Sequence, residues 1–218
     1  MDSRLLQLAD SAFPSGSFTH SFGFEALRQL DLLNGEAALV TRLAELCWHT
    51  ASTALPFFNE AFDGASAEAS DARNELYLSN HVARRASSAQ GRAFLLAAEA
   101  MLEGHPAQPR VLALRAGLPH AHVAVAMGAC FSALGLARDE ARQLFLFAAL
   151  RGALSALVRL GALGPLRAQH LLFNLHPTLA QVLEQTRTLG AGDAASLAPL
   201  LELAQSAHDR LYSRLFQS

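Results

Sequence analysis

A stretch rich in serine and phenylalanine, residues 13–25, contains the residues closest to a nucleophile pattern. It places Ser15, Ser17 and Ser21 around His20. A serine beside a histidine can become an activated nucleophile. However, the Gly-x-Ser-x-Gly pattern that links a strand to a helix in serine hydrolases is absent. We therefore expect a loop packed on the core, and the sequence predicts no catalytic residue.

Nine histidines raise the question of a metal site. The closest pair, His120 and His122, falls in a predicted helix over 120–134, where residues two apart point to different sides. The other candidates are six apart or stand singly on predicted helices: His170 and His176, and His49 and His81. We expect surface or hydrogen-bonded structural roles for these histidines, with no bound metal and no cofactor.

Three arginines at helical spacing, Arg84, Arg85 and Arg92, could form a basic patch for an acidic partner. A solvated helix face is the favoured interpretation. An arginine finger offered to a partner GTPase is a further alternative, for which the sequence nominates no particular residue. The chain contains no lysine, which excludes Schiff-base chemistry and a P-loop nucleotide site.

Length and composition suit one compact domain. The chain has 218 residues, of which 51% are apolar and only 17% charged, so we expect part of its surface to be covered by partners. The net charge is −2 and no basic run is present, which argues against nucleic-acid binding.

No membrane span or secretory signal is predicted. The richest apolar stretch, 123–136, is interrupted by glycines, and Asp2, Gln7 and Asp10 break any signal-peptide pattern. We therefore expect a cytoplasmic protein without a membrane partner. Cys47 and Cys130 lie in apolar helical surroundings and are expected to be reduced core thiols.

Helical periodicity runs through almost the whole chain, and paired strand patterns are absent. We predict an all-α fold, a single compact helical bundle of about nine to ten helices. The predicted helices cover residues 3–10, 22–33, 36–53, 67–85, 87–103, 120–134, 138–160, 165–185 and a last segment after Pro199. The segment 138–160 is apolar nearly all round, so we expect it at the centre of the bundle.

A run of small residues at 190–195 suggests a linker. It divides the chain into a helical domain, 1–189, and a linker with a carboxyl-terminal docking segment, 190–218. We expect that segment to be mobile until a partner binds it.

The two ends of the sequence carry a family resemblance. Residues 208–218, His-Asp-Arg-Leu-Tyr-Ser-Arg-Leu-Phe-Gln-Ser, resemble the terminal signature of the urease accessory protein F (UreF) family. The opening resembles that family's amino-terminal loop and helix start through Leu6-Gln7-Leu8, Pro14, Gly16, Ser21, Gly23 and Glu25. Between them, Leu55-Pro56, Arg84, Gly91, Val158-Arg159-Leu160, Gly164 and Gln169 follow in the expected order. Ala54, Leu78-Ser79-Asn80 and Pro165 depart from the family pattern.

The resemblance implies a non-enzymatic, dimeric scaffold for urease maturation. Such a protein bridges the accessory protein UreD (also called UreH) and the GTPase UreG, and promotes nickel insertion into apo-urease. Nickel is then delivered cargo and not a resident cofactor. The alternatives are a GTPase-activating protein for UreG acting through an arginine and, third, a stand-alone histidine metal-binding protein.

The resemblance also nominates partner-binding residues. In the carboxyl-terminal segment these are His208, Tyr212, Arg214, Leu215, Phe216 and Ser218, which would fold onto the UreD-type partner. In the loop they are Pro14, Gly16, Ser21, Gly23 and Glu25, near the same or a neighbouring interface. Glu25 is a candidate for gating the GTPase or lining a nickel path.

Overall fold

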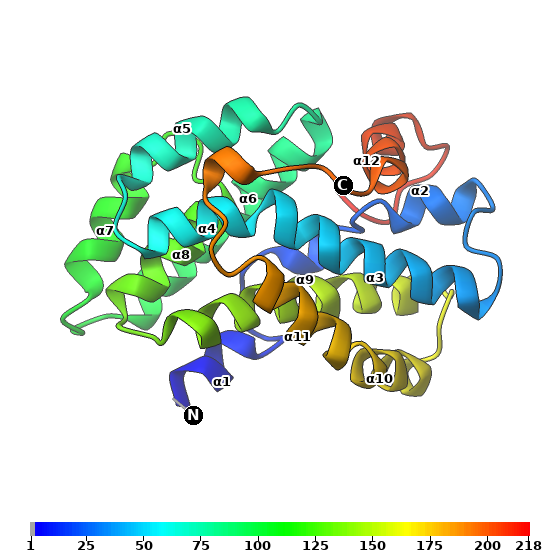
Figure 1. Ribbon diagram of the computed structural model, residues 1–218, viewed down its shortest axis with the longest axis horizontal. Coiled ribbons are helices and arrows are strands. Elements are labelled where there is room, and N and C mark those ends of the chain that lie inside the picture. Colours follow the sequence, from blue (N-terminus) through cyan, green and yellow to red (C-terminus); the bar gives the residue numbers. More distant parts are fainter. Residues whose placement is uncertain (1–2) are drawn as a thin grey trace.

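The computed structural model describes residues 3–218, and the all-α prediction is confirmed: this part of the chain forms twelve α-helices and no strand (Figure 1). The helices are α1 (Ser3–Ala9), α2 (Phe24–Gln29), α3 (Gly35–Thr53), α4 (Leu55–Phe62), α5 (Ala67–Tyr77), α6 (His81–Met101), α7 (Gln108–Gly117), α8 (Val123–Ala133), α9 (Arg138–Arg159), α10 (Pro165–Asn174), α11 (His176–Gln185) and α12 (Pro199–Ser206). Three short 3-10 turns are η1 (Ser17–Thr19), η2 (Ala191–Asp193) and η3 (Ala207–Arg210).

Helix α9 is the central helix, as its nearly uniform apolar sequence predicts. It contacts α1, α2, α3, α4, α8, α10 and α11, and Leu146, Leu150 and Leu157 are fully buried along it. Within the described residues it is also the one helix whose length and composition would allow a membrane crossing, but 61% of its most apolar window is buried in the fold. Core helices commonly meet the same criteria.

Two glycines let helices approach closely around α8. A side chain at Gly128 would place its Cβ 2.4 Å from the Phe58 carbonyl oxygen on α4, and one at Gly91 of α6 would lie 1.8 Å from the Ala121 carbonyl oxygen. Phe131 of α8 lies edge-on to Phe58 and, at 5.7 Å between ring centres, to Phe94 of α6. The inner core therefore depends on the close packing of α4, α6 and α8 against one another.

The predicted helices differ from the observed ones at several places. The break expected at residue 86 lies instead at Leu78–Asn80, because the Asn80 side chain accepts hydrogen bonds from the Val82 and Ala83 amides and so begins α6. The predicted helix 165–185 is two helices, with Pro177 in the first turn of α11. Helices α4 and α7 were not predicted, although each has a proline in its first turn.

The last part of the chain packs against the rest. After η2, the backbone amide of Ala195 donates to the Ser52 carbonyl (3.1 Å), and α12 then contacts α2 and α6. In Figure 1 the final residues, in red, lie beside α2, in blue. Both cysteines are free and buried, as predicted.

Candidate functional site

The two regions that carry the family resemblance meet in space. Residues 13–25 form the amino-terminal loop and the start of α2, and residues 208–218 form the carboxyl-terminal segment. We call the contact between them the seam. It joins positions about 190 residues apart in sequence: the Leu215 amide donates a hydrogen bond to a Glu25 carboxylate oxygen.

Glu25 is the central group of the seam. Its side chain is buried, with the residue only 2% exposed, and one carboxylate oxygen accepts from the Leu215 amide at 2.5 Å. The other accepts from the Phe216 amide (3.3 Å) and from Nε2 of buried His208 (3.2 Å). A buried carboxylate is tolerated only when such partners replace its hydration. Glu25 therefore anchors the carboxyl-terminal segment to the body of its own chain.

Backbone pairing continues the seam beyond Glu25. The Gln217 amide donates to the Thr19 carbonyl at 2.8 Å, and the Ser21 amide donates to the Ser218 carbonyl at 2.6 Å. The Ser218 hydroxyl also hydrogen-bonds Nδ1 of His20. Burial, followed by the charges of His208 and Arg85, lowers the pKa of His20 to about 4. His20 is therefore neutral at pH 7.

Asp209 fixes the beginning of the segment to α6. It accepts a two-pronged hydrogen bond from Arg85 (2.8 and 3.1 Å) and another from His81 (3.2 Å), and Arg214 lies 3.7 Å away. The hydrogen bonds from Arg85 hold the pKa of this carboxyl at about 2. Asp209 was not among the predicted site residues, although it follows His208 in the terminal signature.

A second unpredicted group, Arg159 at the end of α9, joins the two regions through aromatic rings. Its guanidinium carbon lies 3.8 Å from the centre of the Phe18 ring and 4.3 Å from that of Phe216. Stacked cation–π contacts of this kind are favourable, and more so where water is partly excluded. Arg159 thus holds a ring from the loop and one from the segment together.

Gly23 allows α12 to lie against the start of α2. It adopts a left-handed backbone with φ +85°, and a Cβ there would lie 3.0 Å from the Leu201 carbonyl oxygen and 3.1 Å from the Gln205 nitrogen. A larger residue would strain the backbone and displace α12. Gly16 is likewise left-handed, at φ +73°.

The predicted partner-binding residues divide into an inner and an outer set. The inner set, buried within the chain, is His208, Phe216, Ser218, Ser21, Gly23 and Glu25. Gly16 is half-buried, and the outer set is Pro14, Tyr212, Arg214 and Leu215. Tyr212 is fully exposed, Leu215 is 55% exposed, and Phe18, which was not predicted, is 63% exposed. The outer set is therefore the part of the seam that another protein can touch.

The prediction that His120 and His122 lie on one helix and point apart was wrong. Helix α8 begins after them, and their rings stack with centres 5.9 Å apart. His122 hydrogen-bonds Glu75 at 3.0 Å, and His120 lies 3.6 Å from the same carboxylate. Burial lowers the pKa of His122. Among residues 3–218, no group of three or more acidic, histidine or cysteine side chains is arranged to hold a metal ion.

The loop that carries these histidines is fixed by Asp71 of α5. This residue is fully buried, and its carboxylate accepts hydrogen bonds from three successive backbone amides, those of His120, Ala121 and His122, at 2.8 to 2.9 Å. Ala121 has a left-handed backbone, φ 53°, which turns the amides toward one point. The role is structural, and no spacing in the sequence pointed to it.

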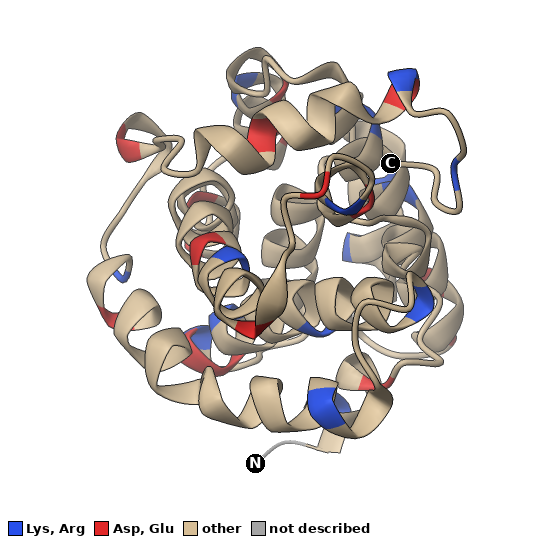
Figure 2. Ribbon diagram, turned by 90° about the vertical axis from the view of Figure 1, so that its right-hand side faces the viewer, with Lys and Arg blue, Asp and Glu red and all other residues tan. Residues whose placement is uncertain are grey.

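The three arginines on α6 do not form a free basic patch. Arg84 lies 3.4 Å from Glu75, Arg85 is bound to Asp209, and Arg92 donates to the Pro119 carbonyl at 3.3 Å. Figure 2 shows charged residues scattered among the helices, with red and blue interspersed. The interpretation of a solvated face with local pairs is therefore the better one.

Comparison with known proteins identifies the family. The UreF family model matches residues 33–176. Urease accessory protein F of Arabidopsis thaliana is 33% identical over 217 residues, which cover 97% of this chain and 90% of that protein. The protein of the same name from Oryza sativa subsp. japonica is 31% identical, covering 96% and 82%. UreF of Paenarthrobacter aurescens (strain TC1) is 28% identical, covering 98% and 96%. With a family model matching most of its length and relatives aligned end to end, this chain belongs to the UreF family of urease accessory proteins.

Proposed function

We propose that this chain is a non-enzymatic scaffold that acts in the cytoplasm during urease maturation. It bridges a UreD-type accessory protein and the GTPase UreG, and so promotes nickel insertion into apo-urease, as a homodimer. Membership of the UreF family supports this proposal. Nickel is cargo in this scheme, and the chain itself performs no covalent step.

The seam is the observation that carries the proposal. The carboxyl-terminal segment is seated on the chain's own body by Glu25, and it presents Tyr212, Leu215 and the neighbouring Phe18 ring to solvent. Tyrosine and arginine are enriched at interface hot spots, so exposed aromatic side chains around a cation suit such a contact. Arg214, also exposed, supplies the cation.

The inner and outer sets have different roles in this proposal. Glu25, His208, Phe216 and Ser218 hold the segment in the shape that a partner recognises. The outer residues make the contacts with the UreD-type protein. In this proposal Glu25 positions the segment, since its two oxygens accept three hydrogen bonds from it; gating of the GTPase or lining of a nickel path by Glu25 stays a separate prediction.

Co-purification with the UreD-type protein and UreG from the same genome tests the proposal. We expect the intact chain to form a stable complex, and the double variant Tyr212→Ala, Leu215→Ser to lose it while remaining folded. Leu166→Ser, at a leucine on α10 that is even more exposed (88%), is the control and should bind normally. A complex that survives the double variant would show that the partner binds elsewhere.

A further inference from the structure

The turn that leads from the amino-terminal loop into α2 has a strained backbone. Its two central residues, Phe22 and Gly23, both have positive φ, at +54° and +85°. The Phe24 amide closes the turn by donating to the Ser21 carbonyl at 2.9 Å. Two central residues with positive φ are typical of the type I′ turn, in which glycine, asparagine and aspartate dominate. Phenylalanine is unfavourable there, because its Cβ crowds the backbone in the left-handed region.

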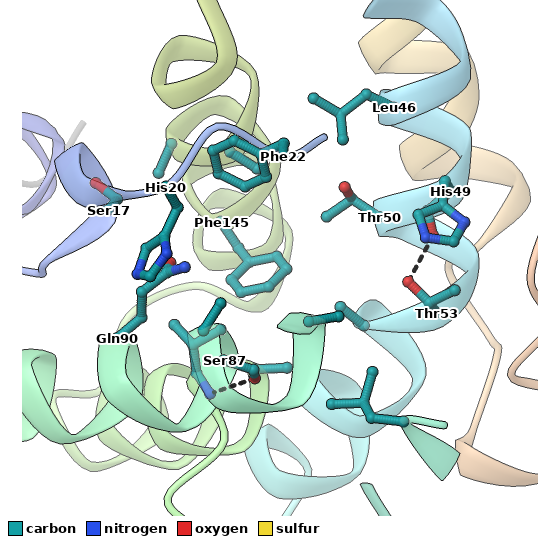
Figure 3. A pocket seen from close by; sticks show the side chains of 18 of the residues that line it. Ser17, His20, Phe22, Leu46, His49, Thr50, Thr53, Ser87, Gln90 and Phe145 are labelled. Atoms are coloured by element: carbon teal, nitrogen blue, oxygen red, sulfur yellow. Dashed lines mark hydrogen bonds between the residues drawn. The ribbon is translucent and has the colours of Figure 1, made fainter. Parts of the chain in front are cut away.

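The Phe22 ring is seated on the central helix α9. A Cβ at Gly152 of that helix would lie 3.1 Å from Cε2 and 3.4 Å from Cζ of the ring. The half-buried ring also lines a half-open pocket of about 360 Å³, together with Phe145 of α9 and Leu46 of α3 (Figure 3). The ring fits against α9 because residue 152 has no side chain.

Contacts with the last part of the fold hold the turn in this conformation. The Ser21 amide, directly before Phe22, donates to the Ser218 carbonyl at 2.6 Å. Gly23, directly after it, lies against α12, where a Cβ would be 3.0 Å from the Leu201 carbonyl oxygen. A strained backbone persists only where the surrounding contacts outweigh its cost. In this turn, part of that support comes from the carboxyl-terminal segment.

From these features we propose that the turn at residues 21–24 is a conformational switch set by the carboxyl-terminal segment. While the segment is docked, Phe22 keeps its left-handed backbone and its ring stays on Gly152. When the segment leaves, φ of Phe22 returns to negative values, the ring leaves α9 and the pocket loses one of its walls. Capture of the segment at the surface is thereby transmitted to the central helix. The switch depends on the contacts of the seam and not on the identity of the partner.

Fluorine NMR of the full chain tests the switch, with para-fluorophenylalanine placed at position 22 alone. In the double variant Glu25→Gln, Asp209→Asn, which weakens two anchors of the segment, we expect the signal to shift toward that of the free amino acid. The same label at Phe94, a fully buried ring that lines the same pocket, is the matched control and should not shift. An unmoved label at position 22 would overturn the proposal, because a strained turn should not outlast its anchors. Movement of both labels would mean a loosened core and would also overturn it.

A pair of variants separates the strain from the ring. Phe22→Ala and Phe22→Gly both lack the ring, but only alanine is strained at positive φ. We expect the docked segment to be about tenfold more populated in Phe22→Gly than in Phe22→Ala. Hydrogen exchange of the Gln217 amide, which donates to the Thr19 carbonyl, measures this. At an unstrained position the order is reversed, since glycine loses more conformational freedom on folding. Equal protection, or better protection with alanine, would overturn the proposal.

The seat on α9 supplies the last arm of the test. Gly152→Ala places a methyl group against the ring, so the fluorine signal at position 22 should shift and exchange of the Gln217 amide should rise severalfold. Alanine favours a helix more than glycine does, so α9 itself would not cause this loss. The same substitution in the Phe22→Gly background, which has no ring, is the matched control and should leave Gln217 protected. An unchanged fluorine signal in Gly152→Ala would overturn the proposal.

Discussion

Two buried carboxylates in this protein perform the same task in different places. Asp71 accepts three backbone amides of the 120–122 loop, and Glu25 accepts two backbone amides of the carboxyl-terminal segment and a histidine. Each joins segments far apart in sequence. The loop at Asp71 is held at both sides by α7 and α8, whereas the segment at Glu25 lies after η3 and has no helix after it among the described residues.

The difference lies in what each carboxylate supports. The loop at Asp71 also carries Ala121, whose carbonyl sits against Gly91, so its release would disturb the packing of α6 on α8. Release of the segment at Glu25 would uncover Phe216 and Arg159 but leave the central helices in place. We therefore expect release at Asp71 to disturb the core, and release at Glu25 to leave the core folded.

The largest effect is expected for Asp71→Ala. The variant leaves three buried amides without an acceptor, and each costs free energy when it is neither bonded nor hydrated. We expect a loss of about 4 kcal/mol in the free energy of unfolding, measured by chemical denaturation. Asp71→Asn, which keeps one carbonyl acceptor, should lose less. A loss as small as that of an exposed substitution would show that the loop is held by other contacts.

A somewhat smaller loss is expected for Gly91→Ala. The new methyl group would meet a backbone carbonyl and not a flexible side chain, so α6 and the 120–122 loop must separate. Overpacking of this kind costs about 3 kcal/mol. Thermal melting monitored by circular dichroism checks it, with Ala93→Gly on the same helix as a control for helix propensity. Equal melting temperatures for Gly91→Ala and the unmodified chain would contradict the close approach.

Glu25→Gln should open the seam without unfolding the core. A glutamine places its oxygen at only one of the two carboxylate positions, and its amide group then faces a donor at the other, so at least one of the three hydrogen bonds is lost; we expect about 2 kcal/mol. Hydrogen exchange should rise at residues 211–218 and remain unchanged in α6 and α8. If exchange rose equally in residues 211–218, α6 and α8, Glu25 would support the core as Asp71 does, and the two carboxylates would not differ in role.

Acid should open the same seam through His20. The unfolded or released histidine binds a proton below about pH 6.5, but docked His20 does so only near pH 4, so protonation favours the open form. The stability of the seam should therefore fall by about 1.4 kcal/mol, or tenfold, between pH 7.5 and 5.5. Hydrogen exchange of the Gln217 and Ser21 amides, corrected for the intrinsic pH dependence of exchange, measures this. His20→Asn, which can hydrogen-bond but does not titrate, should remove the pH dependence.

The smallest effect on stability is expected for Tyr212→Ala. Its side chain is fully exposed, so the free energy of unfolding should change by no more than about 0.5 kcal/mol. A larger change would mean that the outer set supports the fold as well as facing a partner. Chemical denaturation of Tyr212→Ala and Glu25→Gln side by side compares the free energy of unfolding lost in the outer set with that lost in the inner set.

The sequence predicted the fold where glycine and proline punctuate long periodic segments. The predicted limits of 36–53 and 138–160 agree closely with α3 and α9. The break at Leu78–Asn80 has no glycine or proline, and only the capping preference of Asn80 could have indicated it. The prediction for His120 and His122 failed because the helix was assumed to begin directly after Pro119, whereas the loop continues to residue 122.

The site could be predicted only as two separate motifs. The residues of both ends were nominated by resemblance, but nothing in their spacing shows that Glu25 and Leu215 touch across 190 positions. Arg159 was noted as part of a family run, without a role, because a cation between two rings is visible only in three dimensions. The distinction between inner and outer residues likewise depends on burial, which the motifs do not encode.

The sequence separation across the seam also sets when the seam can form during synthesis. While the ribosome makes the first two hundred residues, Glu25 has no amide from residues 215 and 216 to bind, and the Arg159 guanidinium can stack on Phe18 alone. Contacts that close so long a loop form late. We therefore expect a nascent chain to fold its central helices before the proposed docking surface is complete. A partner that recognises this surface would then bind only chains whose seam has formed.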